Sequence, residues 1–168
     1  MAGLYGQQTA QGNLLRLRLA KWRRSIKRAG VSDALPPGCR LIPLAVRGDE
    51  RGQLVAIEGY NEVPFAIARV YYMYATTPGV TRGHHAHRAL NQLAVAVAGS
   101  CTMLLDDGAR RVSVRLDDPA VGLTMGPMIW REMSDFSDDC VLMVLADQVY
   151  DEADYIRDYG DFTALAGA

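Results

Sequence analysis

From about residue 40 onward, the hydrophobic and polar positions follow the two-residue period of β-strands and not the period of helices. The stretch 93–99 alternates along its length, 65–75 is rich in β-branched and aromatic residues, and 140–146 is an apolar run of strand length. The stretch 101–116 contains two strands around Asp107-Gly108, a pair that favours a two-residue hairpin turn. Because turn residues recur about every 8–12 positions, the pattern predicts an all-β protein, either a sandwich or a barrel of antiparallel strands.

The first 34 residues have a different pattern, with apolar residues at helical spacing on a basic background. Positions i, i+4, i+7 and i+11 of this stretch are Leu15, Leu19, Trp22 and Ile26. We expect an amphipathic helix that ends near Gly30 and a linker, 35–40, rich in proline and glycine. The sequence thus predicts a basic N-terminal extension, 1–34, and a β domain, 35–168. The helix is expected to pack on its own domain or on a second subunit, and contact with an anionic membrane surface is the less favoured alternative.

Composition and charge narrow the class of protein. The 168 residues are 49% hydrophobic, enough for a sizeable core, and they contain no apolar run of about 18 residues that would span a membrane. Residues 1–32 carry seven bases and no acid, whereas the remainder carries 11 bases and 19 acids. An acidic main domain argues against general nucleic-acid binding. Three cysteines without metal-type spacing, and no secretory signal, favour a cytoplasmic protein with buried thiols.

All three histidines lie within "RGHHAHRALNQ", residues 82–92. If this stretch is a strand, alternate side chains share a face, so His85 and His87 point one way and His84 points the other. Two imidazoles that enter the interior of a barrel need partners there, since buried polar groups otherwise cost free energy. The pair is therefore a candidate metal site, a candidate acid–base site or a pair of structural core residues.

The spacing around the pair resembles the first motif of the cupins, which are small antiparallel β-barrels. That motif runs Gly, five residues, His-x-His, three or four residues, Glu, six residues and Gly. In this chain Gly79 begins the motif, Gln92 takes the place of the Glu, and Gly99 ends it, and every spacing fits.

The substitution at Gln92 bears on metal binding. Metal cupins bind through both histidines, the Glu and a later His, whereas this chain has a neutral amide at that position and no histidine outside 84–87. Two imidazoles without a carboxylate are fewer ligands than zinc or iron normally take, so we expect no metal. Acid–base chemistry is then the favoured use of the pair.

Five segments of the chain, taken in order, resemble the nucleotide-sugar 3,4-ketoisomerases of the cupin superfamily, which act on dTDP-4-keto-6-deoxyglucose. They span about residues 40–162 and read "DERGQLVAIEG", "VPFAIARVYYMY", "RGHHAHRALNQ", "VGLTMGPMIWREMSDFS" and "CVLMVLADQVYDEADYIRDY". The resemblance implies a jelly-roll barrel and a cytoplasmic homodimer with exchanged N-terminal strands. It also implies that a ketone moves from C4 to C3 of the hexose without a metal or a nicotinamide, so no cofactor is expected. The product of such an enzyme usually passes to a PLP-dependent aminotransferase.

The resemblance assigns the chemistry to His85 and His87. Histidine has an ordinary pKa of about 6.5, so it takes and gives protons near neutrality. The two imidazoles would shuttle protons through an enediol, with His85 favoured as the base that removes the C3 proton. Tyr71, on the preceding strand, would assist the proton movement or orient the sugar; the alternative is a core aromatic residue with a tied hydroxyl.

The resemblance also implies substrate-binding roles for four polar residues. Arg82 would hold the diphosphate, although a solvated loop charge is the alternative. Arg51 and Arg131 match family positions near the sugar that are linked to the configuration at C4, and arginine at both leaves that configuration open. Gln92, at the lost ligand position, is expected to form hydrogen bonds in the pocket.

Two other functions remain open at this point. A nucleotide-sugar 3,5-epimerase of the cupin type also removes a proton beside a ketone, but the sequence gives no sign of the His–Asp catalytic pairing typical of that family. A non-catalytic cupin that binds a sugar nucleotide would keep the pocket but would not need the histidines for turnover.

Overall fold

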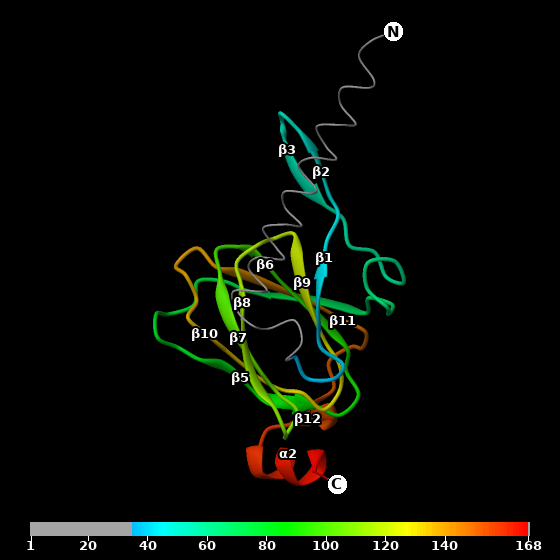
Figure 1. Ribbon diagram of the computed structural model, residues 1–168, viewed down its shortest axis with the longest axis vertical. Coiled ribbons are helices and arrows are strands. Elements are labelled where there is room, and N and C mark those ends of the chain that lie inside the picture. The colour runs from blue at the N-terminus through cyan, green and yellow to red at the C-terminus, as the bar shows by residue number, and fades with distance from the viewer. Residues whose placement is uncertain (1–34, 168) are drawn as a thin grey trace. The chain divides into compact units, whose positions relative to one another are not determined.

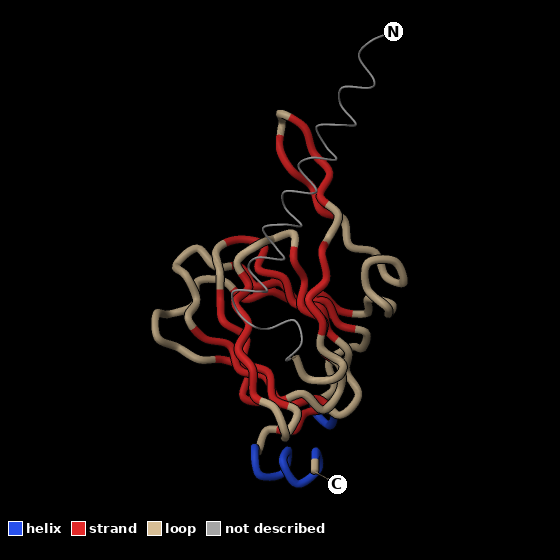
Figure 2. The backbone as a smooth tube through the Cα atoms, viewed as in Figure 1, coloured by secondary structure: helices blue, strands red, loops and turns tan. Residues whose placement is uncertain are grey.

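Strands and their connecting loops form most of the part of the chain that the structure, a computed structural model, describes, which is residues 35–167 (Figures 1 and 2). One five-stranded sheet has the order β1 (Arg40–Pro43), β9 (Val121–Met125), β6 (Gln92–Ala98), β11 (Val141–Ala146) and β4 (Arg69–Met73). The other has the order β12 (Tyr155–Ile156), β5 (Arg82–His87), β10 (Trp130–Ser134), β7 (Cys101–Asp106) and β8 (Arg111–Leu116). A separate two-stranded hairpin consists of β2 (Val46–Asp49) and β3 (Gly52–Val55).

Every pairing between these named strands is antiparallel, which confirms the prediction of an antiparallel β protein. The amphipathic helix predicted within 1–34 lies outside the described residues. Among residues 35–167, no helix is both long and apolar enough to cross a bilayer.

Strand β6 is the most deeply buried strand, because both of its faces are covered. Its first five residues are buried in a row. Leu93 and Val95 pack on one side in a cluster with Leu44, Phe65 and Leu145. The neighbouring Gln92 is equally buried but carries an amide, and it forms its hydrogen bonds with residues of the candidate site. The strand therefore connects the hydrophobic core to that site.

The hairpin predicted over 101–116 is present, but its turn is longer than the expected two residues. Strands β7 and β8 are separated by residues 107–110. The Asp107 carboxylate accepts hydrogen bonds from the backbone N–H groups of Ala109 (2.9 Å) and Arg110 (2.7 Å). Gly108 has a φ of 88°, a left-handed conformation that glycine adopts at little cost. An aspartate-capped loop therefore replaces the predicted two-residue turn.

The C-terminal segment closes one end of the fold beside β5 (Figure 1). A 3-10 helix, η1 (Glu152–Asp154), leads into β12, and α2 (Tyr159–Ala166) follows. The Asp158 side chain caps α2 by accepting a hydrogen bond from the backbone N–H of Asp161. Phe162 of α2 is fully buried and packs with Trp130 and Ile156. This packing holds β12 against β5, with Tyr155 paired to His87.

The β2–β3 hairpin projects away from both five-stranded sheets (Figure 1). Its turn carries Arg51, whose guanidinium pairs with the Asp49 carboxylate at the same tip. Most residues of the hairpin are exposed. A two-stranded ribbon has little independent stability in water, and the last residue of β3, Val55, packs against the core cluster.

Candidate active site

A pocket of about 450 Å³ opens beside β5 and brings together three of the residues that the sequence singled out. These are Tyr71, Arg82 and His85, and they are joined there by Arg69, Tyr150 and Tyr155. Tyr71 comes from β4 in one sheet, whereas His85 comes from β5 in the other. The site therefore depends on the way the two sheets face each other.

A bulge in β5 orients the histidines. Arg131 of β10 pairs with His85 and the next residue pairs with Gly83, so His84 has no partner on β10. Gly83 and His84 both have positive φ values, 88° and 53°. A side chain on Gly83 would lie 2.6 Å from the Arg131 carbonyl oxygen, which only glycine avoids. His84 is exposed while His85 and His87 turn inward, as the strand alternation predicted.

His85 is held as a neutral base. Its Nδ1 atom lies 3.0 Å from the Gly83 carbonyl oxygen. A carbonyl only accepts hydrogen bonds, so Nδ1 carries the proton and Nε2 keeps its lone pair. Burial lowers the pKa of His85 to about 4; the Gly83 carbonyl opposes this shift, and the positive Arg131 adds to it. The imidazole is therefore uncharged at neutral pH, and its Nε2 atom can accept a proton.

His87 is buried behind His85 and is tied to a carboxylate. Its Nδ1 lies 2.8 Å from Oδ2 of Asp154, and Asp154 Oδ1 accepts a hydrogen bond from the backbone N–H of Ala89 at 2.7 Å. Burial and the nearby Arg131 hold the pKa of His87 well below its ordinary value, against the opposing effect of Asp154. Among the described residues, Nε2 of His87 has no hydrogen-bond partner, although it is buried. His87 is 1% exposed and is not among the residues that line the pocket.

The pairing of His87 with Asp154 corrects the expectation that the chain has no His–Asp pair. The two residues are 67 positions apart, and β12 brings them together by pairing with β5. Nothing in the local pattern around Asp154 distinguishes it from the other acids of the "YDEADYIRDY" segment. Only the register of β12 against β5 selects it.

Tyr155 is a second site residue that sequence reasoning missed. Its ring centroid lies 4.9 Å from that of His85 and 4.3 Å from that of His87. The two imidazoles themselves are 4.9 Å apart in a T-shaped arrangement. The Arg157 guanidinium lies over the Tyr155 ring, 4.4 Å from its centre. Tyr155 therefore restricts the orientations of both imidazoles.

Tyr71, Gln92 and Arg131 form a hydrogen-bonded chain across the interior. Gln92 Nε2 donates to the Tyr71 hydroxyl at 2.8 Å, and Arg131 Nη1 donates to Gln92 Oε1 at 3.1 Å. Burial raises the pKa of Tyr71, and it lowers the pKa of Arg131 to about 10, so both groups keep their protons at neutral pH. Within 35–167, Nε and Nη2 of Arg131 have no partner. Gln92 thus bonds to two protein groups and is not among the residues that line the pocket of His85, so its predicted role in substrate binding stays a prediction.

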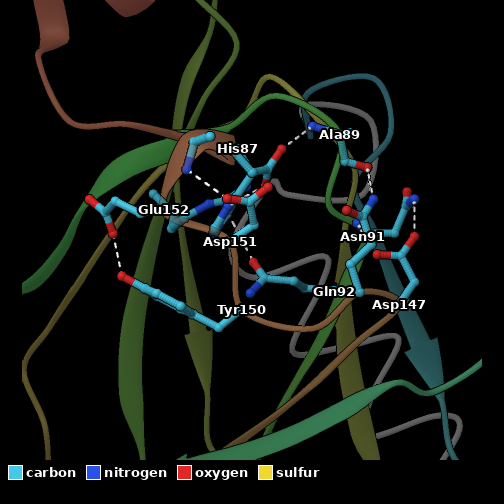
Figure 3. A network of polar contacts seen from close by, with 12 residues as sticks. His87, Ala89, Asn91, Gln92, Asp147, Tyr150, Asp151 and Glu152 are labelled. Atoms are coloured by element: carbon cyan, nitrogen blue, oxygen red, sulfur yellow. Dashed lines mark hydrogen bonds and ion pairs between the residues drawn. The ribbon is translucent and has the colours of Figure 1, made fainter.

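The start of β6 is anchored by a second carboxylate. Asp147 accepts hydrogen bonds from the backbone N–H of Asn91 (2.9 Å) and from its side-chain amide (2.7 Å). Figure 3 shows this pair on one side of Gln92, with Tyr150 and Glu152 joined to each other on the far side of His87. The anchor fixes the backbone next to Gln92, which limits the positions that its amide can take.

The predicted substrate-binding arginines lie in different places. Arg82 is exposed at the start of β5 and lines the pocket, whereas Arg131 is buried behind it. Arg51 lies outside the pocket, on the tip of the β2–β3 hairpin. A single chain therefore brings Arg82, and not Arg51, to the pocket that His85 lines.

The sequence predicts that the site holds no metal, and the structure describes residues 35–167. Within that part of the chain, no group of three or more His, Cys, Asp or Glu side chains is placed to hold a metal ion. The two imidazoles also use their Nδ1 atoms for other partners. Independence from a metal stays a prediction.

Two antiparallel sheets with a neutral imidazole in the pocket between them define a cupin-like protein. The chain belongs to the FdtA family, whose model, described as WxcM-like, C-terminal, matches residues 37–167. It is an isomerase of the 3,4-ketoisomerase type, as its relatives indicate. TDP-4-oxo-6-deoxy-alpha-D-glucose-3,4-oxoisomerase of Aneurinibacillus thermoaerophilus is 54% identical over 114 residues, which are 68% of this chain and 82% of that protein.

Solved structures agree with this assignment. The sugar 3,4-ketoisomerase QdtA of Thermoanaerobacterium thermosaccharolyticum, in complex with TDP, is 41% identical, with a TM-score of 0.78 over 79% of this chain and 97% of that one. A histidine-to-asparagine mutant of QdtA has been solved in complex with TDP-4-keto-6-deoxyglucose. The TDP-quinovose 3,4-ketoisomerase WlaRB of Campylobacter jejuni is 43% identical, with a TM-score of 0.74 over 77% of this chain and 99% of that one.

The likeness to epimerases is limited to the fold. NovW, a 4-keto-6-deoxy sugar epimerase of Streptomyces spheroides, is 20% identical, with a TM-score of 0.61 over 71% of this chain and 68% of that one. The His–Asp pair thus occurs here in a chain whose more similar relatives are ketoisomerases.

Proposed function

We propose that this chain moves the ketone of dTDP-4-keto-6-deoxyglucose from C4 to C3 by proton transfer at His85 and His87. The observation that carries the proposal is the state of His85, a neutral imidazole in the pocket wall whose Nδ1 is already bonded to Gly83. The Nε2 lone pair is then the basic atom offered to a ligand. The relatives named for TDP sugars supply the substrate class.

The reaction needs four proton transfers, two at carbon and two at oxygen, and no net change in composition. A base takes the proton from C3, the electrons of that C–H bond form the C3=C4 double bond, and the C4 oxygen becomes protonated. The resulting enediol loses the proton of the C3 oxygen, and C4 takes up a proton. We assign the removal of the C3 proton to His85 and the delivery of a proton to C4 to His85 and His87 together. The proton exchange between the C3 and C4 oxygens is assigned to Tyr71.

The phosphates would lie on the basic side of the pocket. Arg82 and Arg69 both line it, and Arg69 also lies over the rings of Tyr71 (5.5 Å) and Tyr150 (5.7 Å). Guanidinium groups bind phosphate oxygens through paired N–H donors. The exposed Tyr150 offers an aromatic face to a nucleotide base.

We further propose that the working enzyme is a cytoplasmic homodimer with a jelly-roll barrel in each subunit. The β2–β3 hairpin extends from its own sheets and carries Arg51 away from its own pocket, which fits a hairpin that reaches a second subunit. Arg51 would then complete the partner's site. Three buried free cysteines within the described residues suit a reducing compartment.

The direct test uses metal-stripped protein and dTDP-4-keto-6-deoxyglucose, with the sugar carbons followed by NMR. Appearance of the 3-keto sugar is the expected result. Solvent deuterium at C5 with the ketone still at C4 would support an epimerase, and bound but unchanged substrate would support a non-catalytic cupin. Activity that is lost on chelation and restored by a transition metal would overturn the metal-free mechanism.

A variant of the base sharpens the test. His85→Asn is expected to abolish turnover while the affinity for TDP stays within about tenfold, because the change removes a chemical group and not a binding group. Large loss of affinity with turnover intact would contradict the role of His85.

A further inference from the structure

The orientation of the Gln92 amide follows from the chemistry of its neighbours. Gln92 Oε1 lies 3.1 Å from Arg131 Nη1, and Gln92 Nε2 lies 2.8 Å from the Tyr71 hydroxyl. A guanidinium has only donors, so the amide oxygen must face Arg131. The amide NH2 group must then face Tyr71, and the reverse orientation would place two donors against each other.

This orientation determines what the Tyr71 hydroxyl can do. The hydroxyl oxygen accepts a hydrogen bond from Gln92, and the amide NH2 cannot accept one in return. The hydroxyl proton must therefore find a different acceptor. Among the described residues, Tyr71 donates to none, and its side chain lines the pocket that His85 also lines. The proton is thus turned toward the space where a ligand would bind.

The charge of Arg131 favours proton donation by Tyr71. Arg131 is 2% exposed and, in the described part of the chain, forms no ion pair with a carboxylate. Burial keeps the Tyr71 hydroxyl protonated by raising its pKa, while Arg131 and the Gln92 hydrogen bond act in the opposite direction. The hydroxyl is neutral before it reacts, and the negative charge that develops when it gives up its proton is stabilised.

We propose that Arg131, Gln92 and Tyr71 form a one-way hydrogen-bond relay, in which Gln92 is a positioning residue that turns the Tyr71 proton toward a sugar oxygen. The inference rests on the proposed ketoisomerase function. In the first half of the reaction Tyr71 gives its proton to the C4 oxygen as the C3–H electrons form the double bond. In the second half the phenolate takes the proton from the C3 oxygen as the C3 ketone forms. Gln92 touches neither oxygen and acts through Tyr71.

The isosteric change Gln92→Glu reverses the relay. A carboxylate only accepts, so it would bond to Arg131 on one side and draw the Tyr71 proton away from the pocket on the other. We expect kcat to fall by about 100-fold while KM stays within about threefold, since the lost interaction acts in the transition state. Gln148→Glu adds a carboxylate at an exposed position just after β11, where the amide's long hydrogen bond to the Ala89 carbonyl (3.4 Å) is lost, and it is expected to change kcat by less than about twofold.

The decisive comparison repeats the substitution in a Tyr71→Phe background, with single-turnover NMR to measure slow variants. In that background Gln92→Glu is expected to lower kcat by less than about threefold, because the Tyr71 hydroxyl that Gln92 orients is absent. Equal losses in both backgrounds would overturn the relay and indicate that Gln92 acts on packing or on the substrate itself. A loss of less than about threefold on Tyr71→Phe alone would overturn it as well.

A second variant covers the case in which Gln92→Glu does not fold. Gln92→Met keeps the volume and removes both hydrogen bonds, so Tyr71 is free to rotate, and kcat is expected to fall by roughly tenfold in the native background only. An equal fall in the Tyr71→Phe background would again contradict the relay. Absence of turnover in the unaltered protein would overturn the proposed function, and the relay with it, before any variant is compared.

Discussion

His87 donates through Nδ1 to the Asp154 carboxylate across 2.8 Å, and the same carboxylate receives the backbone N–H of Ala89. One acid therefore holds both the imidazole at the end of β5 and the loop that follows it. The arrangement specifies the tautomer of His87, with the proton on Nδ1 and the lone pair on Nε2. It also accounts for the position of the C-terminal segment, because η1 and β12 must lie against β5 for the contact to form.

Asp154→Asn is expected to reverse the tautomer of His87. The asparagine oxygen would keep the Ala89 N–H, so the NH2 group would face Nδ1 and force the imidazole proton onto Nε2. We expect kcat to fall by about 100-fold with little change in KM, measured by NMR turnover. Asp138→Asn, at an exposed position, serves as the control. An unchanged kcat would show that the His87 tautomer does not matter to the reaction.

The pH dependence of kcat/KM is expected to reflect the lowered pKa of His85. A base works when deprotonated, so activity falls only as pH drops through the folded-state pKa of about 4, well below the ordinary value of about 6.5. We expect a flat profile from pH 8 to about 5, measured with circular dichroism to confirm that the fold persists. His84→Asn, on the exposed face, should leave the profile unchanged. An acidic limb centred near 6.5 would mean that His85 is not the base, or that it is not desolvated in the working enzyme.

Gly83→Ala is expected to be much more costly than Gly79→Ala. Both positions have positive φ, 88° and 77°, and each alanine loses about 1 kcal/mol or slightly more for that conformation. At Gly79 the added Cβ meets nothing within 4 Å, whereas at Gly83 it lies 2.6 Å from the Arg131 carbonyl oxygen. We expect a loss of about 2–4 kcal/mol for Gly83→Ala in urea unfolding, with lower kcat as His85 moves. Equal losses at the two glycines would contradict the close approach of β5 and β10.

The proposed exchange of hairpins between subunits predicts that two weakened variants restore each other. Arg51→Ala and His85→Asn homodimers are each expected to be weak. In a mixed dimer, one site would combine His85 of one chain with Arg51 of the other. Random reassociation of equal amounts should restore about one quarter of the unaltered activity, since half of the dimers are mixed and each has one complete site. If mixing restores no activity, Arg51 does not act across a dimer.

The local pattern predicted a large part of the candidate site. The spacing from Gly79 to Gly99 placed His85 and His87 on one face of a strand, and the structure has them there. The sequence also predicted that Gln92 forms hydrogen bonds, and its buried amide bonds to Tyr71 and Arg131, although it does not line the pocket of His85. These features depend on residues close together in the chain, for which strand periodicity is sufficient.

The partners of those residues could not be predicted in the same way. Tyr155 and Asp154 reach the imidazoles only because β12 pairs with β5, and Arg131 reaches Gln92 only because the two sheets face each other. Pairing register is determined by the packing of whole sheets, and a shift of one residue would send each side chain to the opposite face. The turn at 107–110 was also mispredicted, since two aspartates bond to its backbone in place of a tight two-residue turn.

The sequence alone determined that this protein is an antiparallel β protein with paired histidines and no carboxylate in the usual ligand position. Only the tertiary structure decided which acid holds His87, which amide directs Tyr71, and which arginine stands outside the pocket of its own chain. The reason is physical: the direction of a side chain along a strand is a local property, whereas its hydrogen-bond partner depends on which distant strand lies beside it.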